Sequence, residues 1–380
     1  MMKIDISFER LPLWQGVQEE PGVRRSFPFH LGWDPRGFIS QTTEKHILEQ
    51  VIQTYAEEDY THGTKPPGAS EWANRLGDEK FEFVVQNCGS LQGKSILEIG
   101  AGSLYVANKL TDKHEINQYL IIDPAIQETV SKKNIKILRQ YFDKDMSFDT
   151  TIDLVIGFSV LEHVPDPIRF LLDLHSKLHP VSGTAILSFP DIKRQFRDGD
   201  FNAIAHEHTS YLTPATAIRM FNNCGFSVLK HETRSDTLWF FVEANRNQTN
   251  IDSFPMDEEL LIAALKFHQN ITYVSKKINS LSKKGKTIAI HGSSNGLNNL
   301  FFLSDLEKYK NIKIFDNDSS KTGKYLPACS IPIKHSSDPN YKTTDIVFVA
   351  ALSFYEEIKD FLISTHGLPE EQILPLYPQD

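Results

Sequence analysis

Cysteine is scarce in this sequence, long apolar runs are absent, and positive charge does not exceed negative charge. The three cysteines, Cys88, Cys224 and Cys329, form no CxxC pair, which excludes a disulfide framework and a four-cysteine zinc site and indicates a reducing compartment. The net charge of −9 argues against nucleic acid as a general partner. No segment approaches the roughly 20 apolar residues that span a bilayer, and the first residues lack the apolar core of a signal peptide. We therefore expect a cytoplasmic protein without a membrane partner.

The composition, with 40% hydrophobic and 23% charged residues in 380, is that of a folded globular protein of two or three domains. Residues 1–80 are broken by prolines and predict an irregular extension or lid with one short helix over 44–57. Residues 81–250 form the main unit. An amphipathic pattern within 251–285 predicts a linker helix over 257–284, and residues 286–380 form a second unit.

Short apolar runs alternate with helical stretches in both units. SILEIG, QYLIIDPA, IDLVIGFS and GTAILSF predict four strands buried on both faces, and residues 236–244 predict a further one. A second series, KTIAIHGSSNG, NIKIFDND, TTDIVFVAA and EQILPLY, begins after Gly285. The fold class is therefore α/β: a Rossmann-like parallel sheet with helices on both sides, followed by a second Rossmann-like domain.

A glycine-containing turn follows the first strand of the main unit. Its sequence is LEIGAGSL (97–104), in which Glu98 precedes Gly100 and Gly102, and Asp123 ends the next strand. Glycines there allow a ligand to approach the backbone, and an acid at the end of the next strand can accept hydrogen bonds from a ribose diol. The acid before the glycines, and the lack of GxGxxG, disfavour a dinucleotide; a purely structural turn is the remaining alternative.

These motifs resemble those of class I S-adenosylmethionine-dependent methyltransferases. Glu98 resembles the acid of that family's first motif, and FSVLEHV (158–164) resembles the segment after its fourth strand. Leu104 stands where a third glycine is common. The resemblance implies that S-adenosylmethionine is bound by Glu98, Gly100, Gly102, Asp123 and Ser159.

The segment FNAIAHEHTSY (201–211) holds a second candidate site. His206, Glu207 and His208 allow three interpretations: a general base with an orienting carboxylate, a metal site built on the two histidines, or a solvated loop. A metal site needs a third ligand that the sequence does not single out. In an extended segment, His206 and His208 would share one face and Glu207 would take the other.

Residues from about 80 to the end resemble bacterial C-methyltransferases that act on nucleotide-linked keto-deoxysugars. The resemblance rests on residues 201–211, where the family has a Tyr-His-Glu-His segment, and on HGSSNG (291–296), FDND (315–318), KTGKYLP (321–327) and IPI (331–333). It implies that His208 removes a proton beside the sugar ketone and that Glu207 orients or polarises the reacting centre. His206 would form part of the same wall of the active site. Residues 81–250 would then be the methyltransferase core.

The same resemblance implies a small-molecule substrate, a nucleotide sugar, held partly by the C-terminal domain. Its substrate-binding residues would be Tyr211, Gly292, Ser293, Asn295 and Asp316. A domain that only supports the core is an equal alternative for residues 286–380, because glycine turns of this type are common in α/β folds.

The sequence departs from that family at several positions. Ala205 replaces the tyrosine, RSDTL (234–238) replaces a glycine-rich turn, Asn295 stands where relatives often carry lysine, and no cysteine-rich zinc module precedes Cys88. These departures keep two alternatives open: an O- or N-methyltransferase acting on a related glycan precursor or small metabolite, and a non-catalytic protein that binds S-adenosylmethionine. No pattern in the sequence indicates the oligomeric state.

Overall fold

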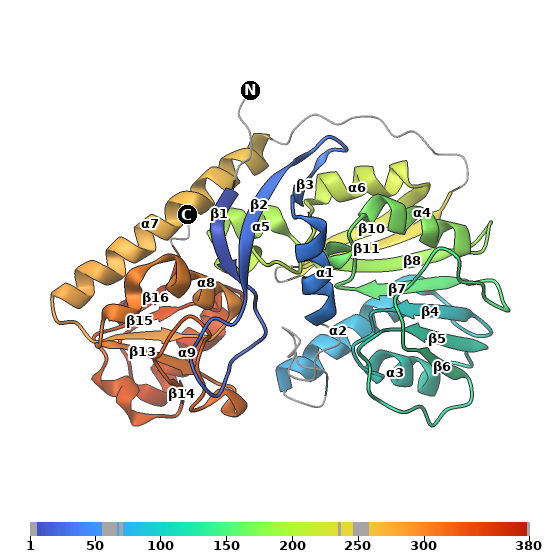
Figure 1. Cartoon of the computed structure of the whole chain (residues 1–380). Helices are drawn as coiled ribbons and strands as arrows, with labels where there is room; N and C mark the ends of the chain where they lie inside the picture. Colours follow the sequence, from blue (N-terminus) through green and yellow to red (C-terminus); the bar gives the residue numbers. More distant parts are fainter. Residues whose placement is uncertain (1–5, 55–66, 68–70, 235–236, 246–257, 378–380) are drawn as a thin grey trace.

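A computed structural model describes residues 6–54, 67, 71–234, 237–245 and 258–377. The described part contains three β-sheets with helices packed between and around them (Figure 1). Parts of three predicted elements lie outside the described residues. These are residues 55–57 of the helix predicted over 44–57, residue 236 of the strand predicted over 236–244, and residue 257 of the linker helix predicted over 257–284. Residues 235–236 of the RSDTL turn also lie outside them.

The largest sheet has seven strands in the order β10-β11-β8-β7-β4-β5-β6. The strands β6, β5, β4, β7 and β8 run parallel to one another, whereas β11 runs antiparallel to both β8 and β10. Every residue of β4 and β7 is buried, as their continuous apolar sequences predict. The strand bounds are β4 Ser95–Ile99, β5 Gln118–Ile122, β6 Ile135–Leu138, β7 Leu154–Phe158, β8 Thr184–Pro190, β10 Phe226–Arg234 and β11 Thr237–Ala244.

Helices flank this sheet, and local sequence signals explain where several begin. At α4, Asp166 caps the first turn by accepting from the Arg169 N–H, and proline occupies the first helical position. At α6, Thr213 and Thr216 form a reciprocal capping box. The helix bounds are α2 Glu71–Cys88, α3 Tyr105–Lys113, α4 Pro167–Lys177, α5 Ile192–Asp198 and α6 Pro214–Asn223.

The N-terminal region is more regular than the sequence suggests. Three antiparallel strands, β1 Ile6–Pro12, β2 Ser26–Asp34 and β3 Phe38–Gln41, join the short strand β9 Ser210–Tyr211 in a four-stranded sheet, followed by the expected helix α1 Lys45–Gln53. Because β9 begins two residues after His208, pairing of Ile39 with Tyr211 attaches this sheet to the second candidate site. Figure 1 shows the sheet between the two larger ones.

The predicted linker helix is α7, Glu258–Lys283, and Gly285 follows it with a φ of 75°, a left-handed conformation suited to glycine after a helix. The C-terminal sheet is wholly parallel, in the order β14-β13-β12-β15-β16, and confirms the second α/β series. Its elements are β12 Ile288–His291, α8 Asn295–Leu303, β13 Ile312–Asp316, β14 Ile333–His335, β15 Ile346–Val349, α9 Tyr355–His366 and β16 Ile373–Pro375.

One hydrophobic core joins the N-terminal sheet, the α5 region and the C-terminal sheet. It includes Leu11, Phe196 and Ile290, which come from these three parts of the chain. Phe267 of α7 belongs to the same core, with its ring centroid 5.1 Å from that of Phe196 and 5.0 Å from that of Phe201. None of the helices in the described ranges has both the length and the apolar character needed to cross a membrane.

Candidate active site

The first candidate site begins at a buried acid on β4. Glu98 is 2% exposed, and the hydroxyl of Tyr119 donates to its Oε2 at 2.7 Å. Burial raises the pKa of Glu98 to about 7, although the hydrogen bond from Tyr119 and the charge of Lys80 oppose this. Glu98 lies near the carboxyl end of β4. The raised pKa shows that Tyr119 and Lys80 only partly compensate the cost of burying its charge.

The turn after β4 depends on its glycines. Gly100 and Gly102 both have a φ of 66°, and a Cβ on Gly100 would lie 2.6 Å from Cγ2 of Val160. A Cβ on Gly102 would meet no atom within 4 Å, so that glycine borders open space. This geometry allows a ligand to lie against the turn.

Two N–H groups of this turn already have carboxylate partners. Gly102 donates to Oδ2 of Asp123 at 2.7 Å, and Leu104, the residue before α3, donates to Oε1 of Glu128 at 3.1 Å. A phosphate would compete with these acids and be repelled by them, whereas a cationic ligand would be attracted. The turn is therefore not a phosphate site, in agreement with the argument from sequence against a dinucleotide.

Asp123 is buried, and its carboxylate already accepts hydrogen bonds from backbone N–H groups. Its Oδ1 accepts from the N–H groups of Ala125 and Ile126 at 2.8 and 3.1 Å, in addition to the Gly102 contact. A carboxylate has about four acceptor positions, so roughly one remains for a hydroxyl group.

The segment after β7 is conformationally strained. Ser159 has a φ of 55° and is the only described residue other than glycine with a positive φ. Such strain persists only where surrounding contacts enforce it, and it concentrates at functional sites. The short 3₁₀ helix Leu161–His163 follows, and it places Glu162 and His163 beside His208 of the second candidate site.

The expectation that His206 and His208 share one face is wrong, because residues 205–208 form a turn closed by the His208 N–H and the Ala205 carbonyl at 3.1 Å. His206 is 2% exposed; its Nε2 donates to the carbonyl of Leu11 at 2.9 Å, and its ring packs edge-on against Phe27 and Phe29. Burial lowers its pKa to about 4. His206 therefore attaches this turn to the N-terminal sheet and does not line the cavity beside His208.

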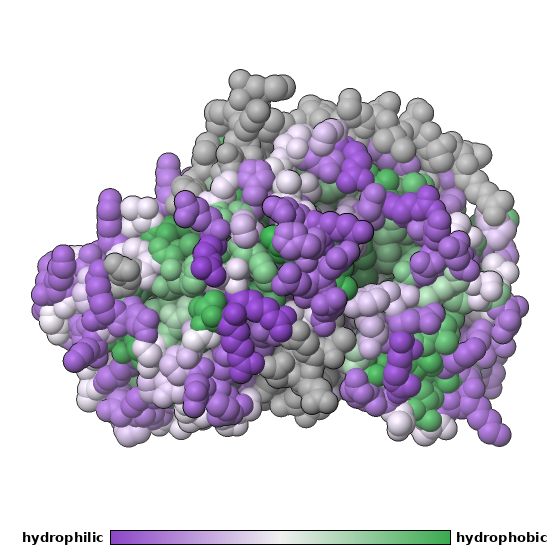
Figure 2. Space-filling view, viewed as in Figure 1, coloured by the Kyte–Doolittle hydropathy of each residue, from purple (hydrophilic) through white to green (hydrophobic). Residues whose placement is uncertain are grey.

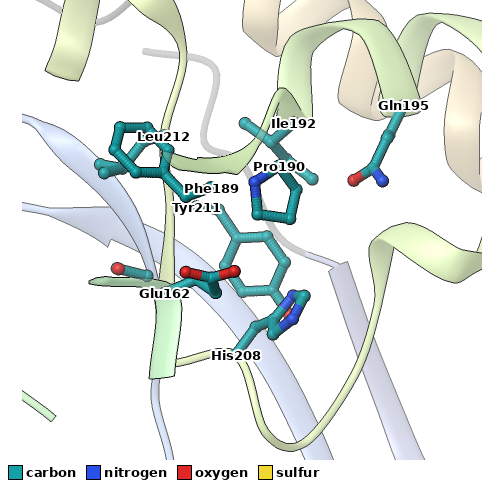
Figure 3. Close-up of a pocket in the computed structure, with 9 residues that line it drawn as sticks. Glu162, Phe189, Pro190, Ile192, Gln195, His208, Tyr211 and Leu212 are labelled. Carbon is teal, nitrogen blue, oxygen red and sulfur yellow. The ribbon is translucent and has the colours of Figure 1, made fainter. Parts of the chain in front are cut away.

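His208 lies against two residues from the segment after β7. Its ring centroid is 4.9 Å from that of His163, and the ligating atoms of Glu162, His163 and His208 all lie within 4.8 Å of one another. Together with Tyr211 and the apolar residues Phe189 and Leu212, Glu162 and His208 line a cavity of about 10 Å³ (Figure 3). That volume is close to the space for one water molecule.

Electrostatics set complementary protonation states in this cluster. Burial, with the neighbouring charge of His163, lowers the pKa of His208 to about 3, whereas burial raises the pKa of Glu162 to about 8. Glu162 is 4% exposed, and its Oε2 has no hydrogen-bond partner among the residues that the structure describes. At neutral pH the pair is therefore a neutral imidazole, able to accept a proton, beside a neutral carboxylic acid, able to donate one.

The backbone of Glu207 fixes the tautomer of His163. The carbonyl of Glu207 accepts from Nδ1 of His163 at 3.0 Å, so a neutral His163 carries its proton on Nδ1 and leaves Nε2 as an acceptor, 3.9 Å from Oε1 of Glu162. Tyr211 likewise holds the turn, because its hydroxyl donates to the carbonyl of Ala205 at 3.2 Å.

Two family models match this chain. A methyltransferase domain matches residues 71–231, and a C-methyltransferase C-terminal domain matches residues 264–366. The chain is an S-adenosylmethionine-dependent methyltransferase. A probable S-adenosylmethionine-dependent methyltransferase of Mycolicibacterium smegmatis is 25% identical over 231 residues, which cover 56% of this chain and 80% of that protein.

Solved structures of similar fold share little sequence with this methyltransferase. The N-methyltransferase NodS of Bradyrhizobium japonicum, in complex with S-adenosylhomocysteine, is 15% identical with a TM-score of 0.37, and covers 52% of this chain and 98% of its own. The complex of DhpI with S-adenosylhomocysteine is 16% identical with a TM-score of 0.38, and covers 54% of this chain and all of its own.

The residues after β4 fit the cofactor of this methyltransferase. S-adenosylmethionine carries a positive sulfonium and no phosphate, which suits a turn whose N–H groups are bound to carboxylates. Gly102 borders open space, and Asp123 retains an acceptor position. Leu104, in the place of a third glycine, buries its side chain in the core and leaves the turn unobstructed.

The glycine turn of the C-terminal domain is bound to protein groups. Ser293 and Lys321 both donate to Oδ2 of Asp316, and a Cβ on Gly292 would lie 3.2 Å from Ala351. Asn295, at the start of α8, donates to the carbonyl of Ile204 at 3.0 Å. None of Gly292, Ser293, Asn295 and Asp316 lines the cavity beside His208.

Instead, α8 docks onto the segment that leads to His206. The N–H of Gly296 donates to Oδ1 of Asn202 at 2.7 Å, and the amide of Asn299 donates to the carbonyl of Ile204 at 3.1 Å. A Cβ on Gly296 would lie only 2.7 Å from the backbone nitrogen of Asn202. The close approach between the two domains therefore requires glycine at this position.

Sequence reasoning missed three polar residues of the site. Glu162 and His163 lie in the LEHV stretch that supported the resemblance, but nothing in the sequence shows that they meet His208. Lys80 of α2 lies near both Glu98 and Glu162, and a single lysine in an amphipathic helix carries no signal of burial.

Proposed function

We propose that this methyltransferase transfers a methyl group to a carbon atom beside the ketone of a nucleotide-linked keto sugar. The observation that carries the proposal is the juxtaposition of His208 and Glu162, whose ligating atoms lie within 4.8 Å of each other where both residues line one cavity. The match of residues 264–366 to a C-methyltransferase C-terminal domain supports carbon as the acceptor atom.

In this proposal His208 is the general base. A neutral imidazole can remove a proton from a carbon made acidic by an adjacent ketone. Glu162, which keeps its proton up to about pH 8, can donate a hydrogen bond to the ketone oxygen as negative charge develops there. The two groups thus act at opposite ends of the same enolisation.

Other residues hold this pair in place. The backbone of Glu207 orients His163 beside His208, and His206 fixes the turn to the N-terminal sheet. Glu98, Gly100, Gly102, Asp123 and Ser159 would hold the cofactor at the carboxyl edge of the sheet. S-adenosylmethionine, when bound, supplies the electrophilic methyl group that the enolate carbon receives.

The size of the cavity sets a requirement for the acceptor. About 10 Å³ is the space for one water molecule, so a nucleotide sugar would have to lie outside it and direct only its reacting atoms toward His208 and Glu162. Tyr211 would contribute its ring as a wall, and Gly292, Ser293, Asn295 and Asp316 would act on the substrate only indirectly, through the docking of α8.

The test is turnover of a panel of nucleotide-linked keto sugars with S-adenosylmethionine, followed by NMR of the product. The proposal predicts a new carbon–carbon bond to the methyl group, and loss of turnover in His208→Ala but not in His46→Ala, an exposed histidine on α1. A methyl group on oxygen or nitrogen would instead establish the O- or N-methyltransferase alternative. Absence of turnover with every acceptor, despite cofactor binding, would contradict the proposed substrate class.

A further inference from the structure

Gln195 is a polar residue of the cavity beside His208 that has no role in the proposed proton transfer. It lies on α5 and lines the cavity together with Glu162 and His208. Figure 3 shows its side chain extending from the helix toward the side of the cavity on which His208 lies. The carboxamide is therefore placed where it can contact an acceptor.

Only the backbone of Gln195 is engaged in hydrogen bonds within the described part of the chain. Its N–H donates to the carbonyl of Asp191 at 3.1 Å, and its carbonyl accepts from the N–H of Asp200 at 3.0 Å, whereas its carboxamide has no protein partner there. Two other polar side chains of the cavity wall, Ser210 and Tyr211, donate to backbone carbonyls at 3.3 and 3.2 Å. A carboxamide has two donor hydrogens and an acceptor oxygen, so Gln195 retains its hydrogen-bonding capacity for a ligand.

Gln195 lies on the accessible side of the cavity. Glu162, Phe189 and Tyr211 are buried, whereas Gln195 and His208 are both partly exposed. Because the cavity, at about 10 Å³, has the space of one water molecule, an acceptor has to approach it from the exposed side. The atoms next to the reacting carbon would therefore lie beside Gln195 when that carbon faces His208.

The helix that carries Gln195 is fixed at both ends. Asp191 caps α5 by accepting from two N–H groups of its first turn. At the other end Gly199 has a φ of 69°, and a Cβ there would lie 1.7 Å from Nδ2 of Asn270 on α7. Phe196, the residue after Gln195, is buried against the same helix. A polar group held on a fixed helix can recognise a ligand more precisely than one on a loop.

We propose that Gln195 is a specificity-determining residue that binds a hydroxyl group next to the reacting carbon of the keto sugar. A hydroxyl group both donates and accepts, as a carboxamide does, whereas a ketone oxygen only accepts. Because Glu162 donates to the ketone in the proposed function, the carboxamide is left for a hydroxyl group. This assignment rests on the proposed function and adds to it a feature that the acceptor must carry.

The competing interpretation is that the carboxamide of Gln195 binds only solvent water. Both interpretations predict that the protein folds without the carboxamide, because the side chain is partly exposed. They differ in whether removing the carboxamide has an effect that depends on a hydroxyl group in the acceptor. Two acceptors that differ only in that group make the distinction.

The experiment compares kcat/KM for a keto sugar that the wild type methylates and for its analogue without the hydroxyl group next to the reacting carbon. The wild type should prefer the hydroxylated sugar about 3- to 10-fold, the range for one neutral hydrogen bond. Gln195→Met, which keeps the length of the side chain, should lower kcat/KM for that sugar by a similar factor and leave the value for the analogue within about twofold. Gln92→Met, which removes an exposed carboxamide before β4, is the matched control and should keep the wild-type preference.

Two outcomes would overturn the assignment alone. Equal kcat/KM for both sugars in the wild type would show that no group binds the hydroxyl, and this measurement needs no variant. A wild-type preference retained in Gln195→Met would show that another residue binds it. Absence of turnover with every keto sugar would overturn the proposed function and this assignment with it, so the two failures are distinguishable.

Discussion

Replacing Glu162 with glutamine is expected to stabilise the folded protein at alkaline pH relative to the wild type, but not at acidic pH. The side chain is 4% exposed, and burial raises its pKa from 4.5 to about 8. Because the folded state binds this proton more tightly than the unfolded state, the contribution to stability is complete below about pH 4.5 and is lost as the pH rises through about 8.

The magnitude follows from the size of the shift. One pKa unit corresponds to about 1.4 kcal/mol, so ionising Glu162 in the fold costs up to about 5 kcal/mol. Structural relaxation and water entry reduce such values, and we expect a difference of about 2–3 kcal/mol between wild type and Glu162→Gln to develop from about pH 5 to about pH 9. A constant cost of burying the amide cancels in this comparison, because only the change with pH is used.

The assay is urea denaturation of both proteins at several pH values, with the exposed Glu115→Gln as the control. The control should follow the wild-type pH dependence throughout. If Glu162→Gln also lost stability with rising pH in parallel with the wild type, the carboxyl group would be ionised at neutral pH, and the assignment of Glu162 as a proton donor would be wrong.

The remaining predictions concern the base, the cofactor turn, the domain contact and a metal. Because the pKa of His208 is lowered to about 3, its basic form persists, and the rate of acceptor deprotonation should change less than about twofold between about pH 7 and pH 5, measured by exchange in buffered deuterium oxide. Gly100→Ala places a Cβ 2.6 Å from Val160 at a positive φ and should weaken binding of S-adenosylhomocysteine at least about tenfold by calorimetry, whereas an unchanged affinity would mean that the turn does not bind the cofactor. Gly296→Ala forces a Cβ against Asn202, and should lower the melting temperature by several degrees and slow turnover while cofactor affinity stays unchanged; a wild-type melting temperature would show that the contact adapts. Dialysis against a chelator should leave turnover intact, because in the proposal His208 accepts a proton and does not bind a metal. Loss of turnover that one divalent metal restores would show that Glu162, His163 and His208 bind that metal.

The sequence predicted the elements whose signals are local. The strands β4, β5, β7 and β8 are continuous apolar runs, and α7 is a long amphipathic repeat that ends at Lys283, shortly before Gly285, so each is recognisable without knowledge of its neighbours. The N-terminal strands were missed because their prolines interrupt the pattern, and because β3 pairs with β9, more than 160 residues away in the chain, in contacts such as that between Ile39 and Tyr211.

The candidate site divides in the same way. Glu98, Gly100 and Gly102 lie in one short motif, whereas His208, Glu162 and Lys80 come together only through tertiary packing. His206 and His208 were placed on one face because an extended segment was assumed, and the turn at residues 205–208 sends them to different neighbours. Turn formation there depends on the Tyr211 hydroxyl and on contacts with other parts of the fold, which the local sequence does not encode.

The most direct test of the account is exchange of solvent deuterium into an accepted keto sugar, with S-adenosylhomocysteine present and no methyl donor. The account predicts exchange at the carbon beside the ketone in the wild-type protein and in His46→Ala, and none above the uncatalysed rate in His208→Ala, even though that variant still binds S-adenosylhomocysteine. Exchange at the wild-type rate in His208→Ala would show that another group removes the proton.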